Sequence, residues 1–145
     1  MPGVGIHNPV VGYAVFCAVK FAGYSLAAWG IGRAYREPHR NAFVVGGTRT
    51  LIGMAAGAAY FGIVQLTANY LHGAFPEVAG PIAYLAGLLP VRLIEWWFLI
   101  WLFYDRPLEK KKLGWAVVSG GTVWSYLCDI PAIAGFLATG GFSVC

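Results

Sequence analysis

Five charged residues lie inside long apolar segments of the chain, where charged side chains are rare. They are Lys20, Arg49, Arg92, Glu95 and Asp129. An isolated charge at the centre of a membrane costs at least about 2.5 to 3.5 kcal/mol, so such residues normally face the protein interior and find partners there. The chemistry open to them is ion binding, proton transfer, or the locking of helices by ion pairs.

The five charges fall at similar depths when each is placed on its own helix. With a rise of about 1.5 Å per residue, three lie roughly 12 to 16 Å from the outer end and two roughly 21 Å from it. We therefore expect one charged layer, roughly 10 Å thick, to which four helices contribute. Three cations and two anions give it a formal charge of +1. Either Lys20 is neutral, or an anion is bound, or Arg49 extends to the cytoplasmic surface.

Helical spacing places further polar groups on the same faces as these charges. Arg92 and Glu95 are three residues apart and share one helix face, so we expect Arg92 to contact a carboxylate. The same spacing identifies four supporting polar residues, namely Tyr24, Tyr60, Ser125 and Tyr126. Gly53 and Gly57 have the small-xxx-small spacing that allows a neighbouring helix to approach closely.

The segments that carry these residues are long enough to cross a membrane. Of the 145 residues, 59% are hydrophobic and only 11% are charged, whereas a soluble domain has about 25% charged residues. Four segments reach the ~20 residues that a membrane helix needs, at about residues 10–31, 43–71, 81–104 and 113–137. Since open sheets leave backbone groups unpaired in lipid, the sequence predicts an all-α bundle of four transmembrane helices forming a single domain, 1–145.

Lys and Arg gather in two of the connecting loops. The residues are Arg33, Arg36 and Arg40 in the first loop and Arg106, Lys110, Lys111 and Lys112 in the third. The positive-inside rule places these loops in the cytoplasm and both termini outside, and we expect the inner (cytoplasmic) membrane. We also expect these residues to contact anionic lipid head groups, although topology signalling alone explains their placement equally well. Basic residues beside apolar spans favour membrane contact over nucleic-acid binding.

The charged layer favours a binding or transport role over catalysis. Motifs for metal, nucleophilic or phosphate chemistry are missing, so we expect neither a metal nor a cofactor. We expect a small, self-associating membrane protein that binds or passes a small anionic solute or a proton. A second hypothesis is a non-catalytic subunit of a larger membrane complex. A third is a membrane enzyme acting on a lipid, with Glu95 or Asp129 as acid or base and the arginines holding a phosphate.

Overall fold

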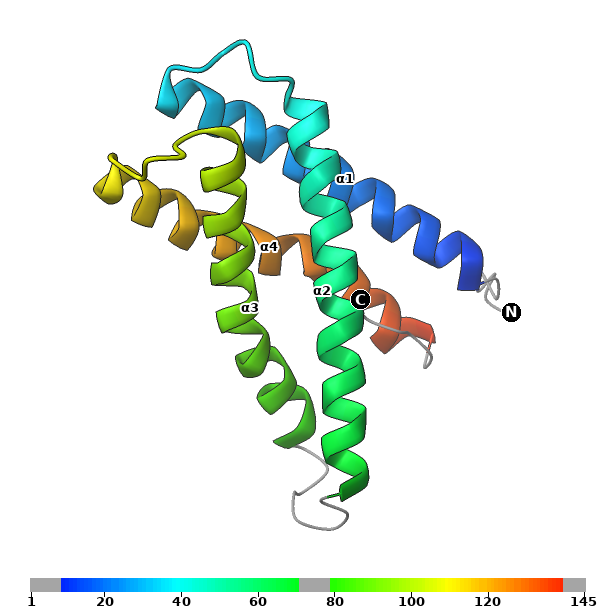
Figure 1. Ribbon diagram of the computed structural model, residues 1–145. Helices are drawn as coiled ribbons and strands as arrows, with labels where there is room; N and C mark the ends of the chain where they lie inside the picture. The colour runs from blue at the N-terminus through cyan, green and yellow to red at the C-terminus, as the bar shows by residue number, and fades with distance from the viewer. Residues whose placement is uncertain (1–8, 71–78, 140–145) are drawn as a thin grey trace. The chain divides into compact units, whose positions relative to one another are not determined.

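The computed structural model contains four α-helices that follow one another along the chain (Figure 1). They are α1 (Pro9–Tyr35), α2 (Ala42–Tyr70), α3 (Ala79–Phe103) and α4 (Lys111–Thr139). The structure describes the backbone of residues 9–70 and 79–139 and the side chains of residues 14–67 and 86–131. The described backbone contains no strand. The predicted all-helical class is therefore confirmed, and each helix coincides closely with one of the four apolar segments.

Three of the helices are long and apolar enough to cross a membrane. These stretches are Ala14–Tyr35, Ala42–Thr67 and Ala86–Phe103. They indicate an integral membrane protein, because spans of this length and composition match the hydrocarbon thickness of a bilayer. The described part of α4 is not among them, since polar residues such as Thr122, Ser125 and Asp129 lower its mean hydropathy. Both termini, whose side of the membrane the sequence predicts, lie outside the described residues.

Side-chain caps define the starts of α2 and α4. The side-chain oxygen of Asn41 accepts a hydrogen bond of 3.0 Å from the backbone N–H of Phe43, in the first turn of α2. The Asp105 carboxylate accepts bonds from the backbone N–H groups of Glu109 (3.2 Å) and Lys110 (2.9 Å), just before α4. A carboxylate at this place satisfies free N–H groups and complements the positive end of the helix dipole. Local chemistry therefore sets where these helices begin.

The chain divides into two compact units. Unit 1 consists of Met1–Thr50 and Val123–Val144, and unit 2 of Leu51–Thr122 and Cys145. The helix α1 belongs to unit 1 and α3 to unit 2, while α2 and α4 contribute residues to both. Each unit has its own buried charged residues, so each is described by itself.

In unit 1, a buried stripe runs along α1 at helical spacing. Its residues are Phe16, Lys20, Tyr24, Ala28, Ile31 and Tyr35. The helix α2 crosses α1 closely at Gly46, where a Cβ atom would overlap the backbone of Ser25. The helix α4 approaches at Gly23, where a Cβ would lie 2.8 Å from the sulfur of Cys128. Glycine at both crossings lets the helices come close enough for short polar contacts between them.

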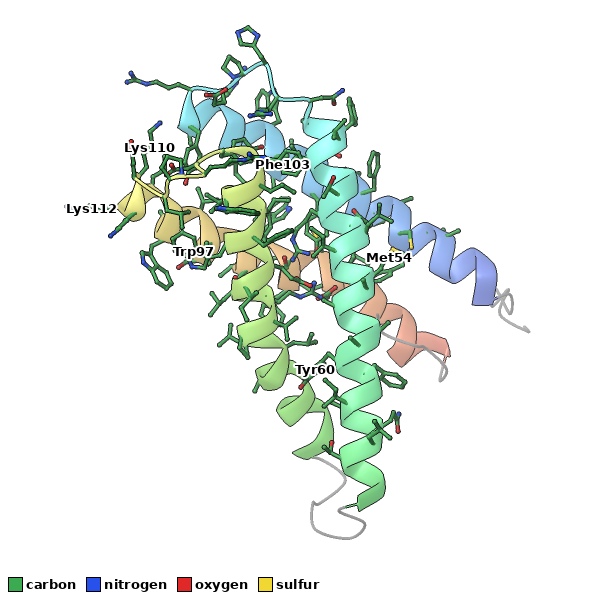
Figure 2. The ribbon with its side chains drawn as sticks, in the orientation of Figure 1. Met54, Tyr60, Trp97, Phe103, Lys110 and Lys112 are labelled. Carbon is green, nitrogen blue, oxygen red and sulfur yellow. The ribbon has the colours of Figure 1, made fainter. Side chains whose placement is uncertain are left out.

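In unit 2, α2 and α3 lie side by side, as the lower half of Figure 1 shows. Tyr60 projects from α2 toward α3 (Figure 2), and its hydroxyl occupies the space over Gly87 where a Cβ would otherwise lie. The start of α4 packs on α3 through Gly121, which is covered by the indole ring of Trp96. The most buried apolar residues of this unit are Leu88, Trp96, Leu99, Ile100 and Val118.

Candidate functional site

All five charged residues that the sequence places inside the membrane are buried in the structure. Lys20, Arg49 and Asp129 belong to unit 1, and Arg92 and Glu95 belong to unit 2. Each unit therefore contains a buried cation and a buried carboxylate from its own segments. The described contacts form one group in each unit, and the single layer expected from the sequence stays a prediction.

The centre of the group in unit 1 is an ion pair between two helices. The Lys20 ammonium on α1 lies 2.6 Å from the carboxylate of Asp129 on α4. The same ammonium lies 4.4 Å from the centre of the Phe16 ring, one turn earlier on α1. The Lys20 amine therefore contacts both a carboxylate and an aromatic face. The pair links the first and last helices of the chain.

Arg49 of α2 is buried beside this pair, one helical turn further along. Its guanidinium donates a hydrogen bond of 3.3 Å to the Ser125 hydroxyl and lies 4.8 Å from the centre of the Tyr24 ring. The residue has 0% exposed surface. The guanidinium is thus directed at α1 and α4, and the alternative in which Arg49 extends to the cytoplasmic surface does not describe this conformation.

Helical spacing explains why these groups meet. Lys20 and Tyr24 are four residues apart on α1, and Ser125 and Asp129 are four apart on α4, so each pair shares one face. The two faces contact each other through Lys20 and Asp129, and Arg49 of α2 contacts the turns that carry Tyr24 and Ser125. Two cations and one carboxylate give this cluster a formal charge of +1. Such a cluster can hold a small anion, or it can hold and release a proton at its carboxylate.

In unit 2, Arg92 and Glu95 form the pair that their spacing predicts. The Arg92 guanidinium lies 3.4 Å from the Glu95 carboxylate on the same helix, and both side chains are buried. The expectation that Arg92 contacts a carboxylate is therefore confirmed. This buried pair is formally neutral, unlike the cluster in unit 1. Trp96, the next residue along, is also buried and covers Gly121 of α4.

The supporting polar residues lie at different places. Tyr24 and Ser125 contact Arg49 in the unit 1 cluster. Tyr126, the alternative to Ser125, is half-buried in unit 1, and Tyr60 is half-buried over Gly87 in unit 2. Of the four polar residues predicted from helical spacing, Tyr24 and Ser125 contact the buried Arg49.

The seven basic loop residues are exposed, as head-group contacts require. Arg33 lies in the last turn of α1, and Arg36 and Arg40 lie in the connection between α1 and α2. Arg106 and Lys110 lie in the connection between α3 and α4, and Lys111 and Lys112 in the first turn of α4. Figure 2 shows Lys110 and Lys112 at the loop end of α4. Their accessibility leaves their charge available to a partner outside the chain.

One contributor to the unit 1 cluster was not predicted from the sequence. Phe16 supplies the ring beneath Lys20, and its position four residues earlier on α1 is the signal that could have identified it. Trp124 donates a hydrogen bond of 3.0 Å from its indole N–H to the carbonyl of Gly23, which ties α4 to α1 beside the ion pair. Among residues with described side chains, no three His, Cys, Asp or Glu residues are grouped as a metal ion would require. Comparison of the chain with protein families, curated proteins and solved structures finds no match.

Proposed function

We propose that the protein crosses the membrane four times, with both termini outside and the two basic loops in the cytoplasm of an inner membrane. The positive-inside rule supports this orientation, because the Lys and Arg residues outside the spans all lie in or beside the first and third connections. The fourth span is α4, whose polar face would be shielded by the rest of the bundle. A reporter enzyme active only outside the cytoplasm, fused after Cys145, is expected to be active. Activity of a cytoplasm-specific reporter there would contradict the orientation.

We propose further that the unit 1 cluster binds or passes a small anionic solute or a proton. The observation that carries this proposal is the charge of +1 that Lys20, Arg49 and Asp129 share while buried. Two cations beside one carboxylate attract an anion, and the Asp129 carboxylate is a group that can accept and release a proton. Arg92 and Glu95 are proposed as a second, balanced pair along the same pathway.

The test is flux through the purified protein in liposomes. Chloride, nitrate and formate serve as anion probes, and a pH-sensitive dye inside the vesicles reports protons. We expect one of these fluxes to exceed that of empty vesicles. Arg49→Gln removes the excess charge while the Lys20–Asp129 pair remains, and it should lower the flux about tenfold or more, as expected for loss of a charge-assisted interaction.

The control is Glu109→Gln, which also changes the chain by one charge but at an exposed loop position. Its flux should equal that of the wild type. If wild-type vesicles pass neither anions nor protons, and none of the anions raises the thermal stability of the protein, the proposal is overturned. The charges would then serve helix packing within the protein or a larger membrane complex.

A further inference from the structure

The end of α1 carries an arginine that is held against a tryptophan. The guanidinium carbon of Arg33 lies 3.9 Å from the centre of the Trp29 ring, one helical turn earlier. The Trp29 side chain is 52% exposed, and Leu26 beside it is also exposed. Tryptophan favours the boundary between hydrocarbon and head groups, because its ring is apolar and its N–H is polar. Stacking thus fixes one arginine at the depth where lipid phosphates lie.

The next arginine occupies a backbone position that suits glycine. Arg36 has φ = 62°, and it follows α1 in a Schellman cap. In this cap the Glu37 N–H donates to the Gly32 carbonyl at 2.8 Å, and the Arg36 N–H donates to the Arg33 carbonyl at 3.2 Å. Residues other than glycine are disfavoured in this left-handed conformation. A positively charged residue therefore stands at a position where the backbone conformation favours glycine.

The third arginine follows directly after a tight turn. The Arg40 N–H donates a hydrogen bond of 3.2 Å to the Glu37 carbonyl, which turns the loop back before α2 begins. Arg33, Arg36 and Arg40 are all exposed, and Glu37 is the single carboxylate within this stretch of the chain. We call Trp29 and these three arginines the α1 corner. Its excess of guanidinium groups suits a phosphate, which arginine binds through paired hydrogen bonds.

We propose that the α1 corner is a binding site for the phosphate of an anionic lipid, independent of the function proposed for the buried cluster. A lipid fits better than a soluble phosphate because the exposed faces of Trp29 and Leu26 continue the site into the hydrocarbon. An acyl chain can lie along these residues while the arginines hold the head group. When lipid is bound, the attraction between Arg36 and the lipid phosphate offsets the free-energy cost of the left-handed backbone at Arg36.

The test compares thermal unfolding of the wild type and Arg36→Gly in nanodiscs of zwitterionic lipid, with and without phosphatidylglycerol. Arg36→Gly relieves the left-handed backbone, so in zwitterionic lipid its Tm should rise by about 2 to 4 °C. Its apparent affinity for phosphatidylglycerol should fall about fivefold, as expected for one basic residue near the surface. One substitution should thus stabilise the protein and weaken its lipid response. Arg36→Lys keeps the charge and should retain most of the response.

The matched control is Leu108→Gly in the other loop. Leu108 is the other non-glycine residue with a left-handed backbone in the described part of the chain, at φ = 54°, and it carries no charge. Leu108→Gly should leave the lipid response at the wild-type level, with a smaller gain in Tm because its half-buried side chain is lost. An unchanged lipid response in Arg36→Gly overturns the proposal. Stabilisation by inorganic phosphate equal to that by phosphatidylglycerol also overturns it, since the site would then not recognise lipid.

Discussion

The two units contain their buried charges in different arrangements. In unit 1, Lys20 and Asp129 from two helices meet at 2.6 Å, and Arg49 adds a second cation. In unit 2, Arg92 and Glu95 lie on one helix, 3.4 Å apart, and their charges balance. A balanced buried pair can serve packing alone, whereas a cluster with one more cation than carboxylates could also hold an anion. The difference identifies unit 1 as the place to look for function first.

The largest expected effect comes from removing the carboxylate of unit 1. Asp129→Leu removes the carboxylate and leaves Lys20 and Arg49 as two buried cations in unit 1, so it should lower the free energy of unfolding by about 3 to 5 kcal/mol. Lys20→Leu leaves one cation and one carboxylate, Arg49 and Asp129, so its loss should be clearly smaller. Thermal or denaturant unfolding in detergent measures both.

The control for this asymmetry is the double variant Lys20→Leu/Asp129→Leu, which leaves only Arg49 charged. Its stability should lie between those of the two single variants. Equal losses for Asp129→Leu and Lys20→Leu would mean that the charge balance of unit 1 does not govern its stability. The interpretation of Arg49 as an excess cation would then fail.

In unit 2 the expected losses are symmetric. Arg92→Leu removes the cation of this buried pair and Glu95→Leu removes its anion, so each should cost about 3 kcal/mol. The double variant Arg92→Leu/Glu95→Leu should recover most of that stability, because it removes both charges from the interior. Flux through the double variant decides its role: full activity indicates packing alone, and lost activity in a folded protein places the pair in the pathway.

The sequence predicted the helices and the local pair for the same physical reason. Apolar length and helical spacing are properties of a single segment, so the four helices and the Arg92–Glu95 pair could be recognised without the fold. The partner of Lys20 could not, because contacts between helices depend on how each is rotated and tilted. The contact of Arg49 with Ser125 depends on the same rotations. Depth estimates bring these residues to similar levels, but they do not choose between partners.

The positions at which two helices cross closely were harder to predict than the positions of the buried charged residues. Gly53 and Gly57 were selected by their spacing and are buried, but the described crossing of α1 and α2 lies at Gly46. The chain contains 20 glycines, so spacing alone offers many candidate crossings. What distinguishes Gly46 is the backbone of Ser25 opposite it, which no sequence pattern shows.

The glycine crossings provide the third way to compare the units. A Cβ at Gly46 would overlap the Ser25 backbone in unit 1, and a Cβ at Gly121 would overlap the Trp96 ring in unit 2. Alanine at either position should cost about 1 to 3 kcal/mol through overpacking. The loss should be larger at Gly46, because a helix backbone cannot rotate away as a side chain can. Unfolding in detergent gives the two values.

The neighbouring glycines provide the controls for these two substitutions. A Cβ at Gly47 would make an ordinary contact of 3.5 Å with Phe21, and a Cβ at Gly120 would meet nothing within 4 Å. Alanine at either should be neutral or stabilise by up to about 1 kcal/mol, since alanine favours the helix more than glycine. Equal losses at Gly46 and Gly47 would argue against a close crossing at Gly46.

The smallest expected effect concerns one aromatic pair in each unit. In unit 2, Trp97 and Trp115 join α3 to α4 edge to face, with centroids 5.1 Å apart and planes at 90°. In unit 1, Phe21 and Phe43 lie 6.2 Å apart with planes at 24°. Aromatic pairs contribute about 0.5 to 1.5 kcal/mol beyond burial. Double-mutant cycles to leucine should place the Trp pair near the upper value, because its positive edge meets a negative face at short distance. A larger coupling energy for the Phe pair would mean that contacts of its exposed rings with lipid contribute more than the relative orientation of the rings does.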